Sequence, residues 1–194
     1  MMKALKNIFV LLLVVFLWPI GLIIMWKWTK WSRWIKVLLT VIVVLPIVFT
    51  FIYWFIAQPF KVSGSSMAPN LNNAEYFMAK KYDREFTFGE IVTYKHPEDL
   101  SQTRIGRIVG LPGQTVEIKN GNVYINSKKL TEPYILSQNN TNPIKEEHTK
   151  AGLQDDEYYM LGDNREHSMD SRAVGKVKKE LIIGSYWFTY SRPE

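Results

Sequence analysis

A cluster of small residues near the end of the first third of the chain has the composition of a nucleophile loop. Ser63, Gly64, Ser65 and Ser66 stand in a row, and Met67 follows them. A serine hydroxyl becomes a nucleophile when a nearby base takes its proton, and a lysine can act as that base if burial lowers its pKa toward neutrality. Taken alone, such a cluster after a helix is most often a flexible linker, so its interpretation depends on the rest of the chain.

Two later segments add charged side chains and turn residues. The first covers residues 107–113 and reads Arg-Ile-Val-Gly-Leu-Pro-Gly. The second covers residues 162–172 and includes Ser168, Asp170 and Arg172. An acid and a base two residues apart can form an ion-paired turn, which orients a site without reacting in it.

In order and content these three segments resemble the conserved boxes of type I signal peptidases, over about residues 58 to 190, and the Gly-Glu-Ile-Val run at 89–92 fits the same pattern. The resemblance implies a serine endopeptidase that uses a Ser–Lys dyad to cut exported preproteins after a small residue. It assigns Ser66 as the nucleophile, whose own backbone N–H can donate to the oxyanion. It implies supporting roles for Met67, Pro69, Ser168, Asp170 and Arg172, and it places Gly64 where some members have a second serine for the oxyanion and others have glycine.

The position of the family's lysine departs from the pattern. In the family this lysine stands immediately before the arginine of the second segment, where this chain has Gly106. Glycine supplies no base. Lys95, on the preceding predicted strand, is a candidate substitute because it could extend into the gap beside Gly106. Lys80, Lys81 and His167 are further candidates. Arg104 is expected on the same strand face as Gly106 but stays protonated at any useful pH.

Two uncharged apolar stretches, residues 8–26 and 37–57, precede the serine cluster. At ~1.5 Å per residue, each is long enough to cross a hydrocarbon core of ~30 Å. We therefore expect two transmembrane helices, with residues 1–57 forming a membrane anchor. A cleaved signal peptide is the alternative for the first stretch, but the bulky Met25, Trp26 and Trp28 stand where a small-x-small cleavage site would be needed.

The net charge of +6 belongs to this anchor, because residues 58–194 carry equal numbers of basic and acidic side chains. This distribution argues against nucleic-acid binding. The connection at 27–36 contains cations and tryptophans but no acid, which is typical of a cytoplasmic loop at the membrane interface. The sequence therefore predicts a multi-pass protein of the plasma (cytoplasmic) membrane with residues 58–194 on the extracytoplasmic face.

After Pro59, short alternating or β-branched runs replace the apolar stretches, and Gly, Pro and Asn separate them. Strands are expected at 90–95, 107–109, 115–118, 122–126, 158–161 and 182–188. Residues 119–122, Lys-Asn-Gly-Asn, predict a hairpin turn. The polar stretch at 137–154 predicts a long surface loop. The fold expected for residues 58–194 is a mostly antiparallel β, barrel-like peptidase domain.

These features predict a membrane-bound serine endopeptidase of the signal peptidase I type, whose partners are exported preproteins, the lipid bilayer and the secretion machinery. The alternative is a catalytically impaired homologue that binds extended peptides as an assembly or chaperone factor for surface proteins, since a peptide can add to a sheet edge without being cut. No metal or organic cofactor is expected, because the chain has no cysteine, no phosphate loop and no ligand spacing among its 3 histidines.

Overall fold

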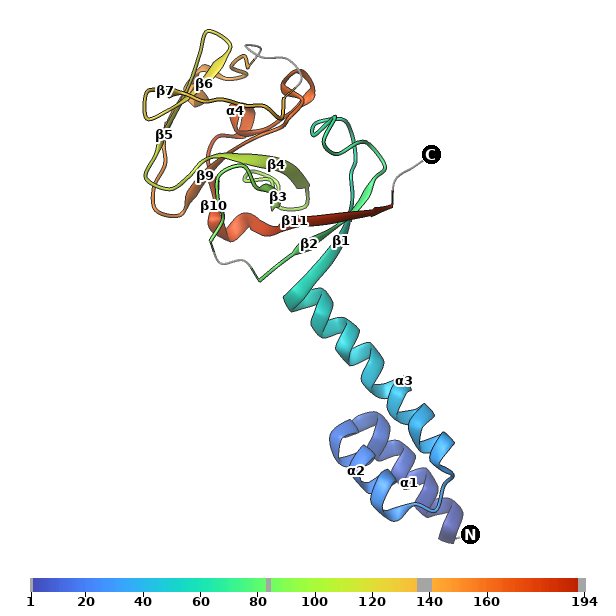
Figure 1. The fold of residues 1–194 in the computed structure, drawn as a ribbon. Helices are drawn as coiled ribbons and strands as arrows, with labels where there is room; N and C mark the ends of the chain where they lie inside the picture. Colours follow the sequence, from blue (N-terminus) through green and yellow to red (C-terminus); the bar gives the residue numbers. More distant parts are fainter. Residues whose placement is uncertain (1, 83–84, 136–140, 192–194) are drawn as a thin grey trace. The chain divides into compact units, whose positions relative to one another are not determined.

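The computed structural model describes residues 2–82, 85–135 and 141–191 (Figure 1). The chain divides into two compact units, Met1–Trp54 and Phe55–Glu194. The division falls close to residue 57, where the composition changes from apolar helical sequence to alternating strand sequence.

The first unit contains two short helices where one long helix was expected over residues 8–26. Helix α1 covers Met2–Phe16 and α2 covers Trp18–Trp28, with Pro19 in the first turn of α2. Proline lacks a backbone N–H and clashes inside a helix but is tolerated in a first turn, so α1 ends and α2 begins at this point. Helix α2 then packs closely on α1, because a Cβ at Gly21 would lie 2.3 Å from the backbone of Leu13 and Val14.

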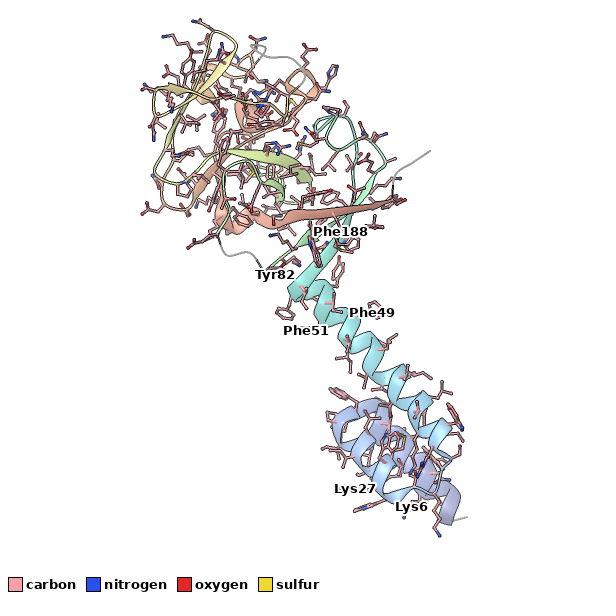
Figure 2. All side chains as sticks on the ribbon, in the orientation of Figure 1. Lys6, Lys27, Phe49, Phe51, Tyr82 and Phe188 are labelled. Carbon is pink, nitrogen blue, oxygen red and sulfur yellow. The ribbon has the colours of Figure 1, made fainter. Side chains whose placement is uncertain are left out.

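Helix α3, Arg33–Phe51, continues into a π-helical turn at Ile52–Ile56. Together they form the one helix, among the described residues, that is long and apolar enough to cross a membrane, at 24 residues. Its apolar side chains, including Phe49 and Phe51, point outward (Figure 2). Near its start, the buried Lys36 donates hydrogen bonds from Nζ to the carbonyl oxygens of Trp26 and Thr29, at 3.1 and 2.9 Å. A cation on these carbonyls stabilises the C-terminus of α2.

The second unit is built mainly from antiparallel strands, as predicted. A seven-stranded sheet has the order β1-β2-β11-β3-β4-β9-β10. Its strands are β1 Ala57–Lys61, β2 Tyr76–Lys80, β3 Ile91–Lys95, β4 Thr103–Gly110, β9 Glu157–Leu161, β10 Val177–Lys178 and β11 Ile182–Ser191. In the described part of the chain no ladder joins β1 to β10, so the sheet is open and the predicted barrel-like character does not extend to a closed barrel.

A second sheet of four strands has the order β7-β6-β5-β8. Its strands are β5 Thr115–Lys119, β6 Asn122–Ile125, β7 Lys128–Lys129 and β8 Lys150–Gly152. The predicted hairpin at 119–122 is confirmed: Asn120 and Gly121 both have positive φ, 51° and 73°, as a tight hairpin turn requires. The remaining short helices are α4 at Ser171–Val174 and 3-10 turns at Glu146–His148, Arg165–His167 and Lys179–Leu181. The expected loop at 137–154 thus contains a turn and β8, and its residues 137–140 lie outside the described part.

Strand β4 separates two hydrophobic clusters of this unit. Ile105 packs against a cluster of Val62, Met67, Leu71, Phe77 and Ala79. Ile108 belongs to a second cluster with Val92, Tyr94, Tyr158, Met160 and Val177. Because successive side chains of a strand point to opposite faces, β4 fixes the loop that carries Met67 relative to the strands that carry Tyr94 and Met160.

Candidate active site

Ser66 lies in the loop between β1 and β2, at the wall of a pocket of about 460 Å³. Three parts of the chain line this pocket. They are the end of β1 with residues 63–66, the start of β4 with the preceding residue 102, and residues 167–169. The structure therefore brings Ser66 and Ser168 to one cavity, as the sequence predicted from two segments far apart. Figure 1 shows how β1 and β4 belong to the same unit.

The loop around Ser66 is held by the residue that follows the serine. Met67 is fully buried, and its carbonyl oxygen accepts a hydrogen bond from Leu71 N at 2.9 Å. Pro69 follows through a cis peptide bond and is exposed. Gly64 has a φ of 92°, which side chains disfavour, and its N–H donates to Asn73 Oδ1 at 2.9 Å. This backbone conformation accounts for glycine at position 64.

The segment after β9 fixes the backbone of Ser66, the predicted nucleophile. Asn164 donates from its backbone N to Ser66 O at 2.9 Å and from Nδ2 to Ser65 O at 3.1 Å. Gly162 lies between the two serines: a Cβ there would be 2.7 Å from Ser66 O and 2.2 Å from Ser168 Oγ. A side chain at residue 162 would therefore collide with the buried Ser168 and with the backbone of Ser66.

Gly106, the position of the expected lysine, is buried in β4 opposite Val92. A Cβ at this position would lie 3.4 Å from Met160 Cβ, 3.4 Å from Tyr94 Cε1 and 3.6 Å from Leu161 O. These are ordinary van der Waals contacts, so a side chain can start here without displacing its neighbours. The missing base is therefore a matter of residue type and not of backbone geometry.

The structure does not bring Lys95 to Gly106. Lys95 pairs with Thr103 and donates from Nζ to Thr103 Oγ1 at 3.2 Å, whereas Gly106 pairs with Val92. Directly opposed residues share a face of a sheet and successive residues alternate, so Lys95 and Gly106 lie on opposite faces. Lys95 is also not among the described residues that line the pocket. Its role as substitute base remains a prediction that this geometry does not favour.

Three other titratable groups lie at or near the pocket. Lys61, Arg104 and His167 line it. Arg104 donates from Nη2 to Gln102 Oε1 at 2.9 Å. Tyr94 packs beside Gly106, and burial raises the pKa of its hydroxyl well above the usual range, with the Asp170 carboxylate adding to the rise and Arg104 opposing it. Tyr94 therefore stays protonated and cannot serve as a base.

Within the described ranges, no three His, Asp or Glu side chains are grouped as metal ligands would be.

Asp170 and Arg172 form the ion-paired turn that the sequence suggested. Arg172 donates from Nε to Asp170 Oδ1 at 2.8 Å and from Nη2 to Oδ2 at 2.9 Å, and both side chains are almost completely buried. Asp170 Oδ2 also accepts from Gly162 N at 3.0 Å. The pair thus holds the glycine that separates Ser66 from Ser168, which is a positioning role.

Sequence reasoning missed a second ion pair, between Arg107 and Asp163. The two side chains meet through Nε–Oδ1 at 2.8 Å and Nη2–Oδ2 at 2.5 Å. Asn70, three residues after Met67, donates from Nδ2 to Asp163 Oδ2 at 2.8 Å. The loop of Ser66 and the segments at 107–113 and 162–172 therefore meet at this carboxylate. The sequence offered one sign of this contact, since Asn70, Arg107 and Asp163 each lie in or next to one of the three segments that resemble the family. Arg107 also lies over the ring of Tyr134, at 4.3 Å from its centroid.

A third missed group braces the same turn from outside the matched segments. Arg165 is buried and binds Glu132 and Thr141 through its guanidinium. Burial, together with the Glu132 carboxylate, raises the pKa of the neighbouring Tyr134 hydroxyl above its usual range. No periodicity or spacing singled out Glu132, because only the folded chain brings it to Arg165.

The chain is similar to several known proteins. A crystal structure of a signal peptidase I from Enterococcus faecalis V583 is 31% identical, covers 53% of this chain and 97% of its own, and gives a TM-score of 0.44. The family model described as Signal peptidase, peptidase S26 matches residues 31–191. Signal peptidase I S of Bacillus subtilis (strain 168) is 38% identical over 146 residues, which are 70% of this chain and 78% of the relative. A signal peptidase I of Bacillus amyloliquefaciens is 35% identical over 145 residues, 70% of this chain and 77% of the relative.

On the family model and the Bacillus relatives, this chain belongs to the peptidase S26 family, the signal peptidases. The resemblance predicted from the sequence is confirmed. Membership in this family makes a serine peptidase the expected class of enzyme, while the roles of individual residues stay predictions.

Proposed function

We propose that this protein is a membrane-bound signal peptidase I-type serine endopeptidase that removes signal peptides from exported preproteins. The observation that carries the proposal is the placement of Ser66 at the wall of a pocket shared with Ser168. Asn164 donates one hydrogen bond to the backbone of Ser66 and one to that of Ser65. A preorganised serine beside an open groove is the arrangement that acyl transfer to a peptide carbonyl needs.

The pocket also fits an extended peptide. Its walls come from the end of β1 on one side and from the start of β4 on the other, and Gly64 and the half-buried Ile105 are among its lining residues. Glycine and serine at residues 63–66 leave room for backbone near the nucleophile. This shape is consistent with the family's preference for small, uncharged side chains at the cleavage site.

We propose further that α3 anchors the protein in the plasma membrane, with the second unit on the extracytoplasmic face. The span that begins at Arg33 starts within the basic, tryptophan-rich segment 27–36. Such a segment is typical of the cytoplasmic side. A second crossing over residues 8–26 requires α1 and α2 to join into one helix in lipid. The partners in this location are the preprotein, the lipid bilayer and the secretion machinery.

Because the chain has no cysteine, its topology can be read from single-cysteine variants. We expect Ser101→Cys, in the exposed turn before β4, to react with a membrane-impermeant maleimide in intact cells. We expect Lys30→Cys to react only after the cells are opened. Labelling of Lys30→Cys in intact cells would contradict the proposed orientation.

The activity is tested by cleavage of a preprotein by the full-length protein in detergent. The native chain should release the signal peptide and Ser66→Ala should not. Ser127→Ala, which changes an exposed serine that does not line the pocket, should cleave at close to the native rate. If the native chain and Ser66→Ala both bind the preprotein and neither cuts it, the proposed activity is wrong and the peptide-binding alternative is the better account.

A further inference from the structure

We propose that His167 is the general base that activates Ser66. The inference rests on the proposed peptidase activity and supplies the group that Gly106 cannot provide. It starts from the pocket, where the basic side chains among the lining residues described are Lys61, Arg104 and His167.

The other cations at the pocket are poorly suited to the task. Arg104 stays protonated at every pH at which the protein works. The ammonium group of Lys61 lies over the ring of Tyr76, at 5.4 Å from its centroid, and Lys61 is an exposed residue. An ammonium group over an aromatic ring makes a cation–π contact, which a neutral amine would lose. Imidazole, in contrast, exchanges its proton near neutral pH without special burial.

Asn164 connects His167 to the nucleophile. His167 ends the 3-10 turn Arg165–His167, and its backbone N donates to Asn164 O at 3.1 Å. In this turn, His167 Nδ1 lies 3.3 Å from Asn164 Oδ1. The same asparagine donates from its backbone N to Ser66 O and from its side-chain Nδ2 to Ser65 O. One residue therefore contacts both the imidazole and the backbone of the nucleophile.

The contacts of Asn164 also select the tautomer of His167. Since Nδ2 of Asn164 donates to Ser65 O, the atom that faces His167 is the amide oxygen, which only accepts. Nδ1 of His167 then carries the hydrogen and donates it, and Nε2 keeps a free lone pair. A nucleophile, a base, and a third group that orients the base are the three parts of an activated serine site.

His167 and Ser66 line one pocket, which is the observation that the proposed proton transfer between them rests on. Nε2 of His167 takes the proton of Ser66 Oγ as the oxygen attacks the scissile carbonyl carbon, and the developing oxyanion accepts from Ser66 N–H. Collapse breaks the C–N bond, and the imidazolium gives its proton to the leaving amine. In the second half, Nε2 takes a proton from water, the hydroxide adds to the acyl ester, and the same proton returns to Ser66 Oγ as the carboxylic acid leaves. The acid then releases its proton to water. Catalytic hydrogen bonds are often long in a structure without substrate and tighten when the substrate binds.

Cleavage kinetics of the full-length protein in detergent test the assignment. We expect His167→Ala to lower kcat by ~10²–10⁴-fold with little change in KM, because a general base contributes about that factor. Added imidazole should restore part of the rate in His167→Ala. The matched control is His96→Asn, since His96 lies in the turn before β4 and an asparagine can still accept from Glu98 N there. The melting temperatures of both variants should equal that of the native chain.

The pH profile separates a base from a structural residue. For the native chain, kcat/KM should fall as the pH drops through the range in which histidine takes up a proton, and this acid limb should be lost in His167→Ala. A lysine at position 106 provides an independent base, so His167→Ala should cost much less in a Gly106→Lys background than in the native one.

Each other outcome decides against the assignment. Native cleavage that needs Ser66 but is unchanged in His167→Ala, with its acid limb intact, overturns the role of His167 and leaves the peptidase function standing. No cleavage by the native chain, with cleavage by Gly106→Lys, shows that His167 does not serve as a base and that the proposed function of the native chain is also wrong.

Discussion

The guanidinium of Arg107 binds both carboxylate oxygens of Asp163, and this pair joins β4 to the turn that holds the nucleophile. The Asp163 side chain is 0% exposed and that of Arg107 is 13% exposed. Asn70 adds a third contact from the far end of the Ser66 loop. The three segments that carry the chemistry are thus connected through one buried carboxylate rather than through the reacting groups.

Removing the charge of this carboxylate should destabilise the second unit. Asp163→Asn leaves the Arg107 cation buried without its counter-ion, a change that typically costs about 3–5 kcal/mol. We expect a clear drop in the melting temperature of the full-length protein, followed by circular dichroism in detergent. Asp155→Asn, at an exposed carboxylate, should melt with the native chain. Equal melting temperatures for both variants would show that the pair contributes nothing.

Gly162→Ala should damage the site more than the fold. The added Cβ would meet Ser168 Oγ at 2.2 Å and Ser66 O at 2.7 Å, so one of the two serines must move. Overpacking of this kind costs about 1–3 kcal/mol in stability. Preprotein cleavage should fall by a larger factor, because both serines line the pocket and a shift of either one alters it. Gly152→Ala, where a Cβ has no neighbour within 4 Å, is the matched control. A Gly162→Ala variant with native kinetics would contradict the close approach of the two serines.

Two substitutions at Gly106 should separate packing from chemistry. Gly106→Ala adds a methyl group at ordinary contact distance, 3.4 Å from Met160 Cβ, and reduces the freedom of the unfolded chain. We expect it to change stability by no more than about 1 kcal/mol and to leave cleavage unchanged. Gly106→Lys should raise the rate, since it adds a base at a buried position. If both variants unfold, the space beside Tyr94 is smaller than the structure indicates.

Gly64→Ser should fail to improve the enzyme, although some family members carry serine at this position. The backbone of Gly64 has a φ of 92°, so any side chain there is strained by about 1–3 kcal/mol. We expect Gly64→Ser and Gly64→Ala to lower the melting temperature equally, because the cost comes from the backbone. A serine variant that is as stable as the native chain and cleaves faster would refute this.

Local patterns in the sequence predicted the parts of the fold that local chemistry decides. Alternating residues predicted the strands, and Asn120 and Gly121 predicted the hairpin. The cluster at 63–66 predicted the loop that lines the pocket. The single helix expected over 8–26 was wrong, because Pro19 starts a new helix that packs on the first one. That contact depends on the close approach at Gly21, which no hydropathy pattern reveals.

The site was harder to predict where it depends on register. Lys95 and Gly106 lie on neighbouring strands, but whether two such residues share a face depends on which positions pair, and the observed pairs put them on opposite faces. The Arg107–Asp163 pair required three segments to meet in space. His167 could be found from the sequence as a neighbour of Ser168, but its link to the nucleophile through Asn164 is visible only in the fold.

The hydrogen bond from Asn164 to Ser65 joins positions 99 residues apart in the chain. During synthesis the serine loop emerges long before the asparagine that holds it, and so it has no organised surroundings until most of the second unit has been made. In a growing chain, the loop that carries Ser66 therefore lacks its hydrogen bonds from Asn164.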